Sequence, residues 1–286
     1  MLMLPCVVYF IVFCYTPMYG VLIAFKSFKI NLGILGSPWV GLQWFNEFIN
    51  SMFFFRLIRN TLMISFYSLL FGFPAPILFA LTLNELKDGL LKRGVQTICY
   101  FPHFISTVIV VGILFMFLSP TDGIINITLQ RFGFSTHNFM QDAKWFRTIY
   151  IGSGIWQGFG WGSIIYMGAI SGIDPQLYDA ATIDGAGRLQ KIKYLTFPSI
   201  KPVIVTLLIL NIGSLFSVGS DKIILMYSPA TFETADVIST YIYRRGILGG
   251  DYSYSAAIGL FNSLINFTLL ATANFISKKV FETSLW

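Results

Sequence analysis

The segment that decides the fold is TIYIGSGIWQGFGWGSIIYMGAISGI, residues 148–173, which contains no Asp, Glu, Lys or Arg. A charged segment, 174–201, follows it, and a second apolar run begins at Pro202. A helix needs roughly 20 apolar residues to cross the ~30 Å hydrocarbon layer, where its backbone must satisfy its own hydrogen bonds. This stretch therefore predicts two membrane-spanning helices joined by a loop in water.

The same kind of charge-free run recurs along the chain, and the runs are too long for the strands of a membrane barrel. The predicted spans lie at about residues 1–25, 60–84, 96–118, 148–171, 202–220 and 254–277. We therefore expect an all-α integral membrane protein with six transmembrane helices in a single domain, 1–286. The first run lacks the basic start of a signal peptide, and its abrupt beginning at Met1 suggests a short or truncated cytoplasmic tail.

The composition excludes several classes of protein. Hydrophobic residues make up 55% of the chain and charged residues only 11%, whereas a soluble domain carries about 25% charged residues. No basic stripe suggests nucleic-acid binding despite the net charge of +6. The three cysteines, Cys6, Cys14 and Cys99, lie in apolar runs without C-x-x-C spacing, so we expect no metal site.

The distribution of Lys and Arg predicts the orientation in the membrane. Segments 85–93, 174–201 and 278–286 carry nine basic residues in 46, whereas the opposite side carries ten in 91. The denser side is placed in the cytoplasm, with both termini. Lys26 and Lys29, which directly follow the first run, oppose this assignment.

The outer segments are predicted to be structured. Helical spacing of apolar residues over Trp44–Phe53 predicts an interfacial helix, a short helix is expected after Asp122-Gly123, and another over Glu233–Arg245 that ends at Gly246. Three basic residues on this side have two alternative roles: they attract an acidic sugar polymer, or they pair with nearby acids. These are Lys222, Arg244 and Arg245, with Asp221, Glu233, Asp236 and Asp251 as the candidate acids.

The cytoplasmic loop contains a short helix signal. Asp174 is a natural N-cap, Pro175 suits the first helical position, and Gly185 and Gly187 supply the stop. A helix this short is not stable alone, so it must pack either in a groove of another protein or on its own bundle, and helix physics alone favours the second. The candidate docking residues are Tyr178, Asp179, Ala180, Ala181, Asp184 and Gly185.

This loop resembles the EAA loop of ABC-importer permeases, whose pattern is E-A-A-x3-G-x9-I-x-L-P. The spacing from Asp179 through Gly185 to Pro198 is the same at every step. The departures are conservative: Asp179 stands for Glu and reaches one methylene less far, Leu195 stands for Ile, and Phe197 stands for Leu.

The rest of the chain is similar to the LplB-type branch of these permeases, which serves polysaccharide and oligosaccharide importers and includes an alginate permease. The similar segments are 17–20, 36–41, 59–61, 71–74, 102–106, 144–147 and 284–286. The resemblance implies a type I importer permease fold in the bacterial cytoplasmic membrane, with the loop helix as a coupling helix. It also implies a second homologous permease, two ATP-binding cassette subunits that hold ATP and Mg, an extracytoplasmic solute-binding protein and a carbohydrate substrate such as alginate.

The chain itself carries no energy-coupling or catalytic motif. The segment Gly89–Gly94 is followed by Val95 rather than the Lys of a phosphate-binding loop, so ATP must be hydrolysed elsewhere. An ion-coupled sugar carrier is the alternative transporter, but the six runs hold no carboxylate. A membrane-embedded enzyme would need a catalytic constellation that is absent. His103 is interpreted as structural rather than as a path residue.

Two further groups of residues have alternative roles. Gly154, Gly158 and Gly162 form a ridge that serves either packing within the bundle or a sliding seam with the partner permease. Polar and aromatic residues of the later runs either line the substrate path or make interhelical hydrogen bonds. They are Gln157, Trp161, Asn211, Ser214, Ser217, Asn262 and Asn266.

Overall fold

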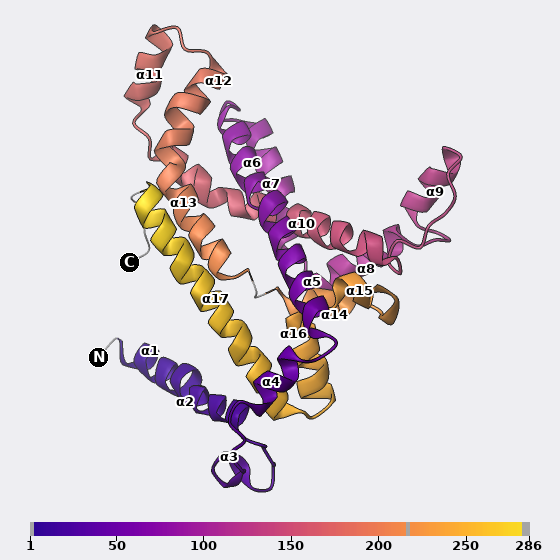
Figure 1. The fold of residues 1–286 in the computed structure, drawn as a ribbon. Helices are drawn as coiled ribbons and strands as arrows, with labels where there is room; N and C mark the ends of the chain where they lie inside the picture. Colours follow the sequence, from indigo (N-terminus) through magenta and orange to yellow (C-terminus); the bar gives the residue numbers. More distant parts are fainter. Residues whose placement is uncertain (1–2, 216–217, 282–286) are drawn as a thin grey trace.

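The computed structural model describes residues 3–215 and 218–281, and within these ranges every regular element is helical. The closing segment 284–286 and the path candidate Ser217 lie outside the described residues. The two longest helices are α10, Ala143–Ser171, and α17, Tyr252–Phe281. Figure 1 shows α17 running beside α13, Phe197–Gly213, while α10 crosses α6, Pro74–Asn84.

Within the described residues, four helices are long and apolar enough to span a membrane, and a bent pair makes a fifth candidate. The four are Leu4–Phe25, Phe54–Asn84, Arg188–Gly213 and Tyr252–Lys279. Helix α10 has 29 residues, which corresponds to about 43 Å and would suffice for a sixth span. The count of six therefore stays a prediction with which this structure is compatible.

Several of these helices contain a short 3₁₀ or π segment. The first is composed of α1 Leu4–Tyr9, η1 Phe10–Tyr15, α2 Thr16–Met18 and η2 Tyr19–Phe25. The second is composed of α5 Phe54–Tyr67, η3 Ser68–Gly72 and α6. It begins before the predicted residue 60, because charged Arg56 is satisfied by an ion pair with Asp236 rather than ending the helix.

The third predicted span is not one straight helix. Leu90–Phe104, which contains α7 Leu90–Tyr100 and η4 Phe101–Phe104, meets α8, Thr107–Phe117, at an angle of 100°. Pro102 lacks a backbone N–H, Ile105 is extended, and the Ser106 side chain then caps α8 by accepting from the Ile109 amide. The hydrophobic run did not reveal this bend.

The fifth span also differs from its predicted bounds. It starts in the predicted loop with α12 Arg188–Lys191, continues through η5 Ile192–Thr196, and ends with α13 at Gly213. Pro198 lies inside this continuous helix and does not interrupt it. The preceding π segment accommodates the proline ring and the missing amide without a break.

Most of the short helices lie in the lower half of Figure 1, at the end of the bundle opposite α11, Pro175–Ile183, whereas α9, Ile124–Arg131, lies to the right beyond one end of α10. The short helices are α3 Gly33–Gly36, α4 Gln43–Ile49, α9 Ile124–Arg131, α14 Ser220–Met226, η6 Pro229–Thr231, α15 Phe232–Ala235, α16 Ile238–Ile242 and η7 Tyr243–Leu248. The predicted helices after Trp44 and after Gly123 are present. The helix predicted over Glu233–Arg245 is interrupted, because Asp236 and Val237 are extended.

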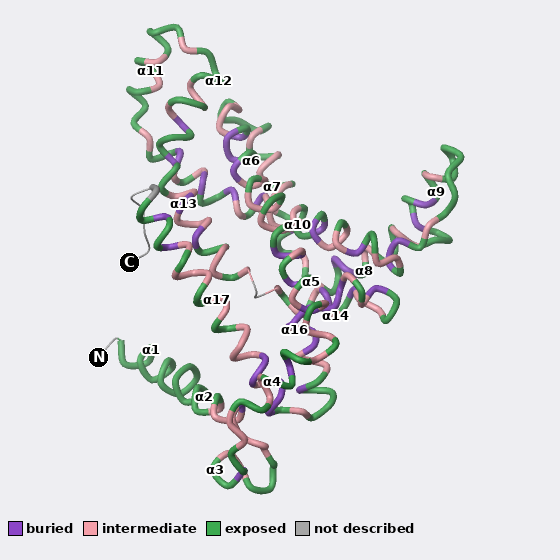
Figure 2. Tube along the Cα trace, in the orientation of Figure 1, coloured by how far each residue is buried: buried purple, intermediate pink, exposed green. Residues whose placement is uncertain are grey.

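Buried side chains form three clusters rather than one central core. One joins α5, α8, α10 and α14, a second joins α4, α5 and α17 around Phe48, and a third joins α6, α10 and α13 around Ile200. By contrast, Figure 2 shows the first span exposed along almost its whole length. The apolar exposed surface is consistent with lipid or a partner subunit covering the helices.

Candidate functional site

A cavity of about 440 Å³ lies between the helices α5–η3–α6, α10 and α13. Its lining combines hydroxyl and amide groups with aromatic rings, including Ser68, Asn211, Ser214, Tyr150 and Tyr166. Hydroxyl and amide groups can hydrogen-bond a sugar, and aromatic faces can pack against its ring. The geometry therefore provides a recess that is largely apolar but carries several hydrogen-bonding groups inside the bundle.

A second cavity, of about 380 Å³, adjoins the first along α10. The two share Ser68, Gly72, Pro76 and Tyr150 in their linings, so they form neighbouring parts of one recess. The second cavity adds Gln157 from α10 and Lys222 from α14. Tyr150 thus lies at the junction of the two.

The structure brings only part of the predicted path residues together. Asn211 and Ser214 line the first cavity, and Gln157 lines the second. Asn262 and Asn266 lie on α17 and line neither of them. Asn211 also donates to the Leu207 carbonyl within its own helix, so it can be satisfied when the cavity is empty.

Gln157 and Trp161 both contact the bend between α7 and α8. The Gln157 side-chain amide donates to the Ile105 carbonyl at 2.8 Å, which satisfies a backbone group released by the break. The Trp161 ring stacks on the His103 ring, with centroids 4.6 Å apart and planes 2° apart. These contacts support the structural interpretation of His103 and give Gln157 a structural contact besides its place in the cavity.

The glycines of the predicted ridge differ in how closely other residues approach them. A Cβ on Gly162 would contact the Pro76 ring at 3.2 Å, whereas Gly158 has nothing within 4 Å. The closest helix crossing occurs instead at Gly160, where a Cβ would overlap the Cys99 carbonyl. Sequence reasoning missed Gly160 because it is offset by two residues from the regular four-residue spacing.

The predicted loop helix forms as α11, Pro175–Ile183. The Asp174 carboxylate accepts from the Gln176 amide at 2.9 Å, and Gly185 ends the helix at a φ of +76°. None of the residues of α11 is buried, and Ile183 is 87% exposed. Figure 1 shows α11 projecting at the end of the molecule opposite α3.

Two side-chain contacts connect α11 to the helix that follows it. The Tyr178 hydroxyl is 2.9 Å from Oγ1 of buried Thr196, and the Lys191 ammonium donates to Oγ1 of Thr182 at 2.7 Å. Tyr178 therefore reaches its own chain, whereas Asp179, Ala180 and Asp184 remain exposed. These two contacts hold one side of the helix, whereas its apolar residues Leu177 and Ile183 stay exposed.

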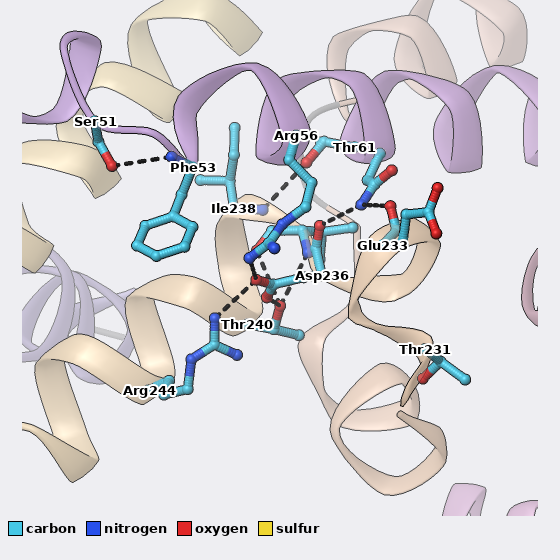
Figure 3. Close-up of polar contacts among 12 residues, drawn as sticks. Ser51, Phe53, Arg56, Thr61, Thr231, Glu233, Asp236, Ile238, Thr240 and Arg244 are labelled. Atoms are coloured by element: carbon cyan, nitrogen blue, oxygen red, sulfur yellow. Dashed lines mark hydrogen bonds and ion pairs between the residues drawn. The ribbon is translucent and has the colours of Figure 1, made fainter. Parts of the chain in front are cut away.

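A buried ion-pair cluster connects the outer helices to α5 (Figure 3). The Asp236 side chain is 0% exposed, and its Oδ2 lies 3.0 Å from Arg56 and 2.7 Å from Arg244. The other carboxylate oxygen, Oδ1, accepts from Thr240, and the Asn60 amide donates to the Asp236 carbonyl. The cluster therefore links the segment containing α15, α16 and η7 to α5, the first helix of the second span.

Two of the three basic residues, Arg244 and Arg245, pair with predicted acid partners. Arg244 pairs with Asp236, and Arg245 pairs with Asp251 at 2.9 Å. Lys222 makes no ion pair among the residues that the structure describes; its ammonium instead donates to the Tyr150 carbonyl at 3.2 Å. Burial lowers the pKa of Lys222 to about 8.

The described residues contain no group of three or more His, Cys, Asp or Glu side chains that could hold a metal ion. The lining of the recess offers hydrogen-bonding groups, aromatic faces and one cation. Long apolar helices around this recess define a membrane transport protein, with an exposed helix available to a partner.

Comparison with known proteins identifies the family. The model of the family described as "binding-protein-dependent transport system inner membrane component" matches residues 72–282, and the chain belongs to this family. It is 43% identical over 286 residues to Protein LplB of Bacillus subtilis (strain 168), covering 100% of this chain and 90% of the relative. The polygalacturonan/rhamnogalacturonan transport system permease protein YteP of the same organism is also 43% identical, with coverage of 100% and 89%.

Two solved structures have the same fold. A chain of a bacterial ABC transporter involved in the import of the acidic polysaccharide alginate has a TM-score of 0.91 at 44% identity, covering 98% of this chain and 94% of that chain. In a complex of a bacterial alginate ABC transporter with the pentasaccharide-bound periplasmic protein, the TM-score is 0.92 at 43% identity, with coverage of 99% and 95%. The chain is thus a type I permease of a binding-protein-dependent ABC importer, in a branch whose relatives transport sugars and oligosaccharides, and it is not an enzyme.

Proposed function

We propose that this permease imports an acidic oligosaccharide across the bacterial cytoplasmic membrane, with both termini on the cytoplasmic side. Two observations support an acidic cargo: relatives at 43–44% identity are named for alginate and polygalacturonan transport, and the recess has a cation in its lining. The C-terminal end of α17 points to the same end of the molecule as α11 in Figure 1, which supports placing it with α11 in the cytoplasm.

The proposed assembly contains a second homologous permease, two ATP-binding cassette subunits and a solute-binding protein. The observation that carries the ATPase contact is the exposure of α11. A nine-residue helix is marginal on its own, and a groove on another protein would bury exposed Leu177 and Ile183. We assign Ala180, Ala181 and Gly185 to this docking surface, with Asp179 and Asp184 at its rim.

The structure suggests how movement of α11 would reach the path. Tyr178 connects α11 to Thr196, and Thr196 lies in the helix Arg188–Gly213. The same helix carries Asn211 into the first cavity. When ATP binding draws the ATPase subunits together, displacement of α11 would move this helix and change the access of the recess. The chain supplies a path and a lever, while ATP and Mg remain on the partner subunits.

The test uses the reconstituted assembly in proteoliposomes. We expect ATP-dependent uptake of galacturonate or mannuronate oligomers, delivered by the binding protein and absent without the ATPase subunits. Uptake by the single chain, driven by an ion gradient, would instead identify a secondary carrier and overturn the proposal.

The docking assignment has its own test. Ala181→Trp should prevent the ATPase subunits from co-purifying while the permease still inserts. Leu90→Trp is the control, because Leu90 is 88% exposed on another segment of the predicted cytoplasmic side. Full ATPase retention by the Ala181→Trp variant would contradict the proposed docking surface.

A further inference from the structure

Lys222 differs from the other residues that line the recess. Among the described residues lining the two adjoining cavities, it is the one that carries a charge. It lies on α14 and is half-buried, and its ammonium reaches the wall of the second cavity beside α10. The Lys222 ammonium therefore lies among hydroxyl, aromatic and apolar groups.

The contacts of Lys222 leave its charge without a counter-ion in the described part of the chain. Its Nζ donates to the Tyr150 carbonyl at 3.2 Å and lies 5.1 Å from the centroid of the Tyr150 ring. By comparison, Arg56, Arg244 and Arg245 on the same outer side each contact a carboxylate. The paired arginines stabilise the fold, whereas Lys222 retains the capacity to bind an anion.

Desolvation makes such a placement unfavourable unless an anion compensates it. Burying a cation costs free energy when no opposite charge is nearby, and the pKa of Lys222 is lowered to about 8 for this reason. A carboxylate that enters the cavity would restore the missing interaction and favour the charged ammonium. The electrostatic environment therefore favours an anionic guest over a neutral one.

The space beside the ammonium suits a sugar ring. A Cβ on Gly154 would lie 3.7 Å from Nζ, an ordinary van der Waals distance, so the backbone of α10 passes directly beside the ammonium. Gly158, one helical turn further along α10, has nothing within 4 Å. Ser68 and Tyr150 border the same space and offer a hydroxyl group and an aromatic face.

We propose that Lys222 is the residue of this permease that selects acidic glycans, by binding the carboxylate of a uronate residue as the oligosaccharide passes the recess. The proposal rests on the proposed function, because it requires an acidic oligosaccharide as cargo. It adds to that function the position at which the charge of the cargo is recognised. Tyr150 would hold the ammonium between successive sugar residues.

The experiment compares Lys222→Gln and Lys222→Arg with the wild-type chain in the complete reconstituted assembly. Each is given galacturonate and mannuronate oligomers and their neutral, carboxyl-reduced counterparts of equal length. Lys222→Gln should lower transport efficiency for the oligouronates about tenfold, as expected for the loss of one charge-assisted contact. Transport of the neutral counterparts should change by less than about twofold, and Lys222→Arg should restore most oligouronate transport.

Lys144→Gln is the matched control. Lys144 is an exposed lysine in the first turn of α10 and lines neither cavity. Lys144→Gln removes one positive charge, as Lys222→Gln does. If the lysine acts by long-range electrostatic steering, both variants should lose oligouronate transport. If it acts by local recognition, only Lys222→Gln should.

The outcomes separate this proposal from the proposed function. Wild-type transport of oligouronates combined with unchanged transport by Lys222→Gln overturns the role of Lys222 alone. Equal losses for the acidic and neutral substrates also overturn it, because they indicate a structural role. A wild-type assembly that transports neither type of oligouronate overturns both proposals.

Discussion

The hydroxyl of Tyr178 lies 2.9 Å from Oγ1 of Thr196, and this contact connects the exposed helix α11 to a buried position in the next span. The rest of α11 has no buried residue, so the orientation of the helix depends on few interactions. A fixed contact at this point would let displacement of α11 move the next span. A helix that rotated freely on flexible ends would not transmit its displacement.

Replacing Tyr178 by Phe should weaken the coupling of ATP hydrolysis to transport. Loss of one hydrogen bond costs about 0.5–1.5 kcal/mol, so we expect a decrease of roughly two- to tenfold in transport per ATP hydrolysed. Tyr194→Phe is the control, since the Tyr194 side chain is 69% exposed. The two rates are measured together in proteoliposomes; an unchanged ratio for Tyr178→Phe would count against the lever.

Gly160→Ala should destabilise the isolated permease. Its Cβ would overlap the Cys99 carbonyl, and overpacking of a close contact typically costs about 1–3 kcal/mol. Thermal unfolding in detergent should therefore occur at a lower temperature than for the wild type. A variant as stable as the wild type would mean that α7 can move away from α10 without cost.

Gly158→Ala is the counterpart, because this position has open space in the isolated chain. We expect unchanged or slightly higher thermal stability of the subunit, as alanine favours the helix by about 1 kcal/mol relative to glycine. Co-purification of the second permease then tests the seam hypothesis. Loss of the partner at unchanged subunit stability would support a seam, and full retention would favour simple packing within the bundle.

Asp236→Asn should strongly destabilise segment 220–250, which contains the short helices around Asp236. It leaves the guanidinium groups of Arg56 and Arg244 close together without their shared carboxylate, and breaking a buried pair costs about 3–5 kcal/mol. Limited proteolysis of segment 220–250 should become faster. Asp251→Asn is the control, because its side chain is 44% exposed and such surface pairs are worth about 0–1 kcal/mol. Equal protection of both variants would contradict the structural role of Asp236.

Transport of oligouronates should depend on the protonation of Lys222, which lies outside the candidate spans. Burial lowers the pKa of Lys222 to about 8, and a bound carboxylate raises this pKa again. As the pH rises through about 8 or somewhat above, the ammonium loses its proton, and oligouronate transport should decline. The Tyr150 ring lies beside the ammonium, and Asp221 is its neighbour on α14. Of the helices α8 and α16, which pack against α14, α16 carries one titratable residue, Tyr241, and α8 carries none. Lys222→Arg should remove this decline from the initial rates measured between pH 7 and about 9.

The features of the candidate site that depend on neighbouring residues could be predicted from the sequence. The features that could not be predicted all depend on contacts between distant segments. Asp174, Pro175 and Gly185 act within a single helical turn of the ends of α11, so their roles follow from the order of residues. Gly160, by contrast, matters only because Cys99 crosses α10 at that level. Likewise, the ion pair between Arg56 and Asp236 joins residues far apart in the chain, and no local pattern records it.

The amino-acid sequence by itself determined that this is a helical membrane permease with a short capped helix between two spans, because charge-free length and end-capping are local properties of the chain. The tertiary structure alone decided that the third span bends by 100°, that Asn211 but not Asn262 lines the recess, and that Lys222 rather than Arg244 faces it. These features depend on which helices cross and at what height, and such crossings arise from contacts between distant segments that hydrophobic periodicity does not specify.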